Sequence, residues 1–199
     1  MSNIRRYTER VSNHLHDFRL GITTGGIAPA QLPGHVFYAT VNYTSTRQLL
    51  RKLCLSAEDI FVDVGCGKGR VVCLAARHKI GQAVGIEYSE ALAAIAEKNI
   101  RNLRGRPSAA DIICQSAEDA DYSNATVLYF FNPFEPPLLD AVLGKIQADR
   151  HGKTTRMAFV MESPAQRQVF SKHSWLACYD RFEDPDKHPV ALYRTMSPP

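Results

Sequence analysis

Closely spaced glycines between two acidic residues form the stretch of this chain best suited to bind a ligand. Asp63 precedes Gly65, Gly67 and Gly69 in DVGCGKGR, and Glu87 follows Gly65 by 22 residues. Apolar runs flank the stretch, so we expect a strand that turns at the glycines directly into a helix. Such a turn aims backbone N–H groups at one spot, and glycine lets a ligand approach closely. An acid ending the next strand can hold both ribose hydroxyls, so the pattern predicts a nucleotide-like ligand.

The charge of Asp63 separates two classes of nucleotide cofactor. A dinucleotide would place its doubly charged pyrophosphate beside this carboxylate and be repelled. S-adenosylmethionine has no phosphate and carries a sulfonium and an ammonium, which an acid attracts. Arg70 also stands where a dinucleotide fold has its third glycine. The residues therefore favour S-adenosylmethionine and disfavour a nicotinamide-dependent oxidoreductase.

This stretch resembles motif I of the class I S-adenosylmethionine-dependent methyltransferases, and the resemblance extends from about residue 58 to 135. It implies that Asp63 lies near the methionine end of the cofactor. Gly65, Cys66 and Gly67 would pass beneath the cofactor, with Gly69 completing the motif, and Glu87 would hold the ribose.

The resemblance also implies an adenine site. Tyr88 would flank the adenine, although packing in the protein interior is an equal alternative. The family often has an acid after the third strand that binds the adenine amino group. Here Ser116 and Ala117 occupy this place, and Glu118 or Asp119 are alternatives for the acid.

A second motif lies at the end of an apolar run, in FFNPF. Asn132, Pro133 and Phe134 are similar to the Asn-Pro-Pro-aromatic motif of amino-group methyltransferases, with one proline before the aromatic residue instead of two. An Asn side chain and a backbone carbonyl can accept hydrogen bonds from an amine and aim its lone pair at a methyl group. The alternative is that these residues only end a strand.

Two further likenesses concern longer stretches. VDVGCGKGRVV together with YFFNPF resembles a group of small bacterial class I methyltransferases. The glycine motif followed by Arg70 and two valines is similar to the non-SET protein-lysine methyltransferases, and this likeness covers the cofactor end only.

Strand and helix patterns alternate from residue 60 onward. Strands are expected at 61–65, 83–87, 111–115, 126–132, 157–162, 175–182 and 191–196. Helices are expected after the first, second and fourth strands, the second of them capped by Ser89, and a short acidic link is expected after the third strand. Ser163 and Pro164 are expected to begin a further short helix after the fifth strand. The pattern predicts a Rossmann-like doubly wound α/β fold with a mainly parallel seven-stranded sheet and an antiparallel C-terminal hairpin. We assign residues 55–199 to this domain and 1–54 to an N-terminal helical extension over the active site.

The extension begins with apolar residues at helical spacing over about residues 3–20, namely Ile4, Tyr7, Val11, Leu15 and Phe18. A Gly- and Pro-rich loop follows, and Thr44 or Ser45 is expected to cap a second helix. Tyr38 and Tyr43 are candidates to gate the methyl-donor end. The alternative is that they pack the extension onto the sheet.

Composition limits the class of protein. Residues 1–52 carry seven basic and two acidic residues, and the remainder carries 17 basic and 18 acidic ones. We interpret this basic surplus as a solvated helix face, with contact to an anionic substrate as the alternative. The five cysteines show no C-x-x-C spacing and are predicted to be reduced core residues, and no metal site is expected. No apolar run approaches the roughly 18 residues of a membrane span, so a cytoplasmic protein is expected.

These features predict an S-adenosylmethionine-dependent methyltransferase that acts on nitrogen, in a protein side chain or a small molecule. An anionic small molecule fits the basic extension, whereas the sequence lacks the interleaved aromatic and basic residues of an RNA-binding module. The alternative is a non-catalytic module that uses the methyltransferase fold to bind a cofactor or a partner.

Overall fold

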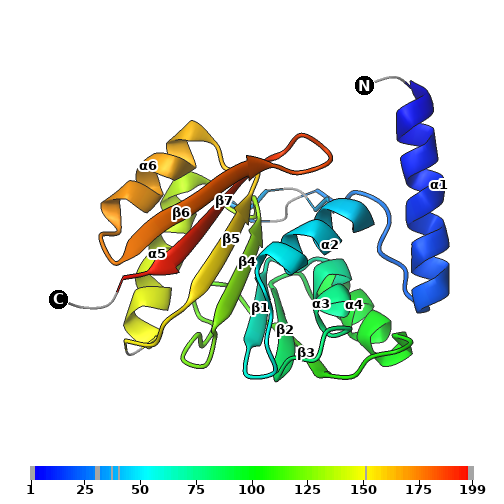
Figure 1. Cartoon of the computed structure of the whole chain (residues 1–199), viewed down its shortest axis with the longest axis horizontal. Coiled ribbons are helices and arrows are strands. Elements are labelled where there is room, and N and C mark those ends of the chain that lie inside the picture. Colours follow the sequence, from blue (N-terminus) through cyan, green and yellow to red (C-terminus); the bar gives the residue numbers. More distant parts are fainter. Residues whose placement is uncertain (1–2, 30–31, 37, 40, 151, 197–199) are drawn as a thin grey trace.

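The chain forms one seven-stranded sheet with helices on both faces (Figure 1). The computed structural model describes residues 3–29, 32–36, 38–39, 41–150 and 152–196, and side chains from residue 11 onward. The strands are β1 (Ile60–Val64), β2 (Gln82–Glu87), β3 (Ala109–Cys114), β4 (Val127–Phe131), β5 (Arg156–Val160), β6 (Leu176–Glu183) and β7 (Pro189–Thr195). Their order in the sheet is β3-β2-β1-β4-β5-β7-β6.

The first five strands run parallel, and β7 pairs antiparallel with both β5 and β6. This confirms the predicted Rossmann-like sheet with an antiparallel C-terminal hairpin. The strand order reverses between β1 and β4, which pair with each other in register from Phe61↔Val127 to Val64↔Phe130. Open parallel sheets bind ligands at the carboxyl ends of strands at such a switch point.

The helices are α1 (Asn3–Leu20), α2 (Tyr43–Lys52), α3 (Arg70–Ala75), α4 (Glu90–Asn102), α5 (Pro136–Asp149) and α6 (Pro164–Lys172). Two apolar clusters separate the two faces of the sheet. Residues of α2, α3 and α4 pack on the face that carries Phe61 and Tyr129. Residues of α5 and α6 pack on the face that carries Leu128 and Phe130. Alternate residues of β4 therefore enter different clusters, as the period of a strand requires.

The N-terminal extension contains the expected helix, but its apolar stripe is not buried. Figure 1 shows α1 beyond the helices of the sheet, with only its C-terminal end near the rest of the fold. Val11, Leu15 and Phe18 are 42%, 56% and 76% exposed, whereas Leu20 is buried. The expected side-chain positions of Ile4 and Tyr7 lie outside the described residues. The periodicity thus identified the helix but not what its apolar residues contact.

The N-caps of three helices can be compared with the residues predicted to cap them. Asn42 caps α2, because its side chain accepts from the Ser45 N–H, so the choice of Thr44 or Ser45 was wrong. Ser89 occupies the N-cap position of α4 without a side-chain bond. Ser163 caps α6 as expected, in a capping box with Gln166.

The cysteine prediction was wrong for three residues. Cys66 and Cys73 are buried, but Cys54, Cys114 and Cys178 are exposed, and none forms a disulfide. Cys114 and Cys178 lie on β3 and β6, the two edge strands, where apolar runs need not be buried on both faces. Within the described part of the chain, no helix is both long enough and apolar enough to cross a lipid bilayer.

Candidate functional site

A pocket opens at the carboxyl ends of β1, β2 and β4, where the switch point was expected to place a ligand. Asp63 of β1 and Tyr129 and Phe131 of β4 line the pocket, together with Glu87 at the end of β2 and Tyr88 just after it. Gly65 and Cys66 supply the wall between them. One cavity is thus surrounded by three features that were predicted separately: the glycine motif, the acid at the end of the second strand, and the end of the fourth strand.

Glu87 is anchored by the glycine loop itself. Its Oε2 accepts from the Gly67 N–H at 2.8 Å and its Oε1 accepts from the Ser89 N–H at 2.9 Å. Burial raises the pKa of this carboxyl, while the backbone N–H groups oppose the shift. A carboxylate has about four acceptor positions, so the two bonds fix its orientation and leave others for ribose hydroxyls.

Asp63 is 3% exposed and lies at the inner end of the pocket. Burial raises its pKa well above the usual carboxyl value, and the nearby Glu87 raises it further. Between the residues that the structure describes, no hydrogen bond reaches this carboxylate. A buried acid of this kind is stabilised by a cationic ligand, which would replace the solvation it has lost.

The glycine loop needs its glycines for two reasons. Gly65, Gly67 and Gly69 have φ angles of +78°, +54° and +77°, in the left-handed region that side chains disfavour. A Cβ on Gly67 would also lie 2.2 Å from the Tyr38 ring, and one on Gly69 would lie 3.1 Å from Ala96. Gly65 and Cys66 line the pocket, whereas Gly67 lies under Tyr38 and Gly69 caps α3.

At the predicted adenine end, Tyr88, Gln115 and Ala117 line the pocket. Ser116 is half-buried and is not among the described lining residues. Its Oγ accepts a long hydrogen bond from the Glu118 N–H at 3.5 Å.

Asn132, Pro133 and Phe134 form a sharp turn at the end of β4 and all line the pocket. Asn132 has a φ of +42°, which is uncommon for a non-glycine residue. Gln166 holds this conformation, because its Nε2 donates to the Asn132 Oδ1 at 2.6 Å and to the Phe134 carbonyl at 2.8 Å. Gln166 was missed in the sequence, although Ser163 followed three residues later by Gln is the signature of a capping box.

A strap from the extension, comprising residues 34–36 and 38–39, covers the pocket. The Val36 N–H donates to the Pro133 carbonyl, and the Glu135 N–H donates to the Gly34 carbonyl. The His35 ring packs against the Tyr88 ring at a tilt of 45°, with centroids 4.1 Å apart, and makes an edge contact with Phe134. The strap therefore contacts both Tyr88 and the Asn132 turn.

Tyr38 lies on this strap and lines the pocket, directly above Gly67. Its hydroxyl donates to the Thr24 carbonyl at 2.7 Å, and the Lys68 ammonium lies 5.3 Å from its ring centroid. Tyr43 is placed differently, since it is 1% exposed, is not among the described lining residues and donates its hydroxyl to Asp17. Tyr38 thus stays a candidate gate, while the contacts of Tyr43 match the alternative that it packs the extension.

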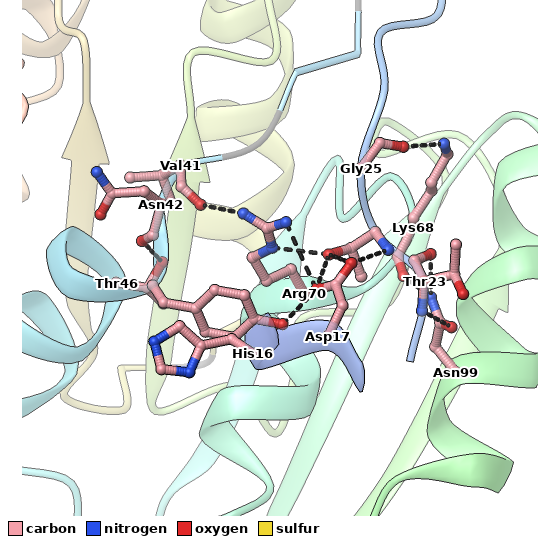
Figure 2. A network of polar contacts seen from close by, with 12 residues as sticks. His16, Asp17, Thr23, Gly25, Val41, Asn42, Thr46, Lys68, Arg70 and Asn99 are labelled. Carbon is pink, nitrogen blue, oxygen red and sulfur yellow. Dashed lines mark hydrogen bonds and ion pairs between the residues drawn. The ribbon is translucent and has the colours of Figure 1, made fainter. Parts of the chain in front are cut away.

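Figure 2 shows the buried polar network that attaches the extension to α3. Arg70 is 2% exposed, and it donates to the Thr24 Oγ1 at 2.7 Å and to the Val41 carbonyl at 3.0 Å. Its guanidinium lies 3.6 Å from Asp17 and 4.6 Å from the Tyr43 ring centroid. The arginine that replaces the third glycine therefore clamps the extension beside the cofactor loop.

The comparisons with known proteins agree with this geometry. A family profile described as "Histone methylation protein DOT1" matches residues 34–110, which hold the strap, Asp63 and Glu87. A protein-lysine N-methyltransferase of Saccharolobus islandicus is 37% identical over 103 residues. In these matches the chain is similar to the class I S-adenosylmethionine-dependent methyltransferases. The Saccharolobus match covers 49% of this chain and 60% of that relative, less than two thirds of its length.

Solved structures with this methyltransferase fold match most of the chain. An RNA methyltransferase from Salinibacter ruber, in complex with S-adenosyl-L-homocysteine, has a TM-score of 0.60 at 21% identity and covers 79% of this chain and 94% of its own. A TehB-like methyltransferase from Corynebacterium glutamicum has a TM-score of 0.57 at 12% identity and covers 77% of this chain and 88% of its own. At these identities the likeness concerns the fold alone.

The pocket residues fit S-adenosylmethionine, the cofactor of the methyltransferases that the chain resembles. Asp63 and Glu87 present buried carboxyls with raised pKa values to one cavity, as a ligand with two cationic groups and ribose hydroxyls requires. The buried hydroxyl of Tyr129, which faces the same cavity, has no hydrogen-bond partner among the described residues. A pyrophosphate has no comparable match, because Asp63 and Glu87 would repel it and the cationic lining residue Arg70 is already bonded to Thr24 and Val41 and paired with Asp17.

Proposed function

We propose that this chain transfers the methyl group of S-adenosylmethionine to the side-chain nitrogen of lysine in a protein. The single observation that carries the proposal is the meeting of the Asp63–Glu87 pocket with the Asn132 turn in one cavity. The name of the Saccharolobus relative and the DOT1 profile support a protein substrate and a lysine acceptor.

The donor end of the pocket performs binding and orientation. When bound, S-adenosylmethionine supplies an electrophilic methyl group on a sulfonium sulfur. Asp63 attracts the cationic groups, and Glu87, fixed by the Gly67 and Ser89 N–H groups, accepts the ribose hydroxyls. The strap excludes water above these residues, which strengthens each electrostatic contact in the pocket.

The acceptor end depends on the Asn132 turn. The Pro133 and Phe134 carbonyls are already engaged by Val36 and Gln166, so they are not the first choice for an incoming amine. The Asn132 Oδ1 accepts one bond from Gln166 and, like any carbonyl oxygen, has a second lone pair. We assign Asn132 the role of accepting a hydrogen bond from the lysine nitrogen, with Pro133 and Phe134 shaping the opening. The lysine would react as the neutral amine after its ammonium has given a proton to water, and the donor would leave as the neutral thioether S-adenosylhomocysteine. Alignment of the nitrogen lone pair with the methyl group would then supply most of the catalysis.

The non-catalytic alternative concerns the same turn. Engagement of Asn132 by Gln166 would also suit a purely structural strand end. The two functions differ in one measurable respect, because a binding module would take up the cofactor without transferring its methyl group.

The test is methyl transfer from methyl-labelled S-adenosylmethionine to a lysine-rich protein, with the products located by mass spectrometry. We expect a gain of a methyl group on lysine, and no gain on the same protein after its amines have been chemically blocked. Asn132→Ala should lower the rate by at least tenfold while cofactor affinity, measured by calorimetry, changes little.

The matched control is Asn124→Ala, because Asn124 is an exposed asparagine before the start of β4, at the opposite end of the strand from Asn132, and is not among the described lining residues. This variant should keep wild-type rates. Cofactor binding without transfer to proteins, nucleic acids or small amines would reject the proposed activity in favour of the binding module. Labelling of RNA alone would reject the protein substrate.

A further inference from the structure

Tyr129 is the buried tyrosine whose hydroxyl lacks a partner in the described part of the chain. It lies in the middle of β4 and is 1% exposed. The other deeply buried tyrosines are satisfied, since Tyr43 donates to Asp17, Tyr122 to the Ala117 carbonyl and Tyr193 to Glu162. Burying a hydroxyl without a hydrogen bond costs about 1–3 kcal/mol, so this exception requires an explanation.

The position of Tyr129 supplies the explanation. It pairs in register with Asp63 on the neighbouring strand, so both side chains project from the same face of the sheet. Both line the pocket. Asp63 is the residue assigned to the methionine end of the cofactor, so the unpaired hydroxyl lies beside the place where charged amino and carboxyl groups would come.

The surroundings of the hydroxyl also fix what it can do. Burial raises the pKa of Tyr129 well above its usual value, and the acids Asp63 and Asp184 raise it further. The hydroxyl therefore keeps its proton and offers a donor. Asp63, by contrast, is an acceptor when ionised, so the two side chains together present one donor and one acceptor to the cavity.

We propose that the Tyr129 hydroxyl donates a hydrogen bond to the carboxylate of the cofactor's methionine end, while Asp63 receives the ammonium of the same group. This inference rests on the proposed use of S-adenosylmethionine. Tyr129 would then bind the amino-acid end of the methyl donor. This role explains why its hydroxyl has no partner in the free protein.

The test compares two ligands that differ in that end. S-adenosylhomocysteine retains the amino-acid group, whereas 5′-methylthioadenosine keeps the adenosine and sulfur but lacks the amino and carboxyl groups. By calorimetry, Tyr129→Phe should lower the affinity for S-adenosylhomocysteine by roughly ten- to hundredfold, because it removes a hydrogen bond to a charged group. The affinity for 5′-methylthioadenosine should not change. The melting temperature of the free variant should not fall, because the lost hydroxyl had no partner.

Tyr193→Phe is the matched control, because it removes a buried hydroxyl that is bonded to Glu162 and to Arg181 outside the pocket. It should lower the melting temperature and bind both ligands as the wild type does. Equal affinities of wild type and Tyr129→Phe for S-adenosylhomocysteine would overturn the inference alone, as expected if the hydroxyl only holds a buried water. Equal weakening of both ligands would overturn it too. Failure of the wild type to bind S-adenosylhomocysteine would overturn the proposed function as well.

Discussion

Two buried carboxyl groups determine the chemistry of the pocket at the scale of single residues. Burial raises the cost of ionising both Asp63 and Glu87, and the charge of Glu87 adds to that cost for Asp63. Such an arrangement destabilises the free protein and is retained where a ligand repays the cost. Function and stability should therefore respond in opposite directions to changes at these residues.

Asp63→Asn provides the first prediction. The free energy of unfolding of the ligand-free protein should rise at neutral pH, by on the order of 1 kcal/mol, because the buried acid is removed. Affinity for S-adenosylmethionine should fall, because the cationic groups lose their partner. Thermal melts and calorimetry measure the two effects, and a variant less stable than the wild type that binds equally well would contradict the assignment.

The pH dependence of the same variant has a defined sign. With its pKa raised, Asp63 binds more protons in the folded than in the unfolded state, so its contribution to stability falls as pH rises above the ordinary carboxyl value of 3.8. Asp63→Asn should lack this loss. Asp59 is the matched control: although burial acts to raise its pKa, bonds from Arg156 and Ser56 lower it, so Asp59→Asn should reduce stability at neutral pH.

Gln166 supplies the second prediction. Ser163 and Gln166 form the capping box of α6, and of these two only the Gln166 side chain bonds to the Asn132 turn. Gln166→Met should lower kcat by tenfold or more through misplacement of Asn132, with the affinity for S-adenosylmethionine unchanged. Ser163→Ala disrupts the same cap and should cost about 1 kcal/mol of stability while kcat is retained. Equal loss of kcat in both variants would show that the helix start, and not the contact with Asn132, matters.

At the scale of elements, the attachment of the extension decides whether the pocket is covered. Asp17 at the end of α1, the Thr24 loop and Tyr43 of α2 all converge on Arg70 at the start of α3 (Figure 2). Both members of the Arg70–Asp17 pair are almost fully buried. Removal of one partner would leave the other charged and uncompensated in the interior.

Asp17→Ala tests this role of the network. It should destabilise the protein by about 3–5 kcal/mol, and limited proteolysis should cut between α1 and α2 faster than in the wild type. Cofactor affinity should fall with it, because the strap is no longer held over the pocket. Arg101→Ala, which breaks an exposed ion pair with Glu97, should cost under about 1 kcal/mol and leave cleavage unchanged. Unchanged proteolysis in Asp17→Ala would show that the strap is held by other contacts.

The elements themselves could largely be predicted from the sequence, because they follow from local periodicity. The apolar runs around Asp63 and before Asn132 indicated β1 and β4, and their turn residues marked the ends. The role of Arg70 could not be predicted, since it depends on Asp17 and Val41, which approach only after the chain folds. The exposed stripe of α1 was missed for the same reason, because periodicity gives a face but not its partner.

At the scale of the whole molecule, the sheet topology brings the site together. Asp63, Glu87 and Asn132 follow three strands that are neighbours in the order β2-β1-β4, so their meeting could be expected once a parallel sheet was recognised. Tyr129 was not recognised as part of the site, because an apolar strand in a sequence gives no sign of which hydroxyl lacks a partner. The sequence left two roles open for Tyr43, gating the pocket or packing the extension. Its ring packs against the guanidinium of Arg70, which explains its burial.

The central claim is that the buried acids receive the cationic methyl donor, and calorimetry in two buffers of different ionisation enthalpy tests it most directly. A cation beside Asp63 and Glu87 lowers their raised pKa values, so binding of S-adenosylmethionine should release protons over the pH range in which these carboxyls are partly protonated in the free protein. S-adenosylhomocysteine, which lacks the sulfonium charge, should release fewer. Absence of binding would contradict the account. So would a binding heat that, for each ligand, is the same in both buffers, because it would show that no protons are released.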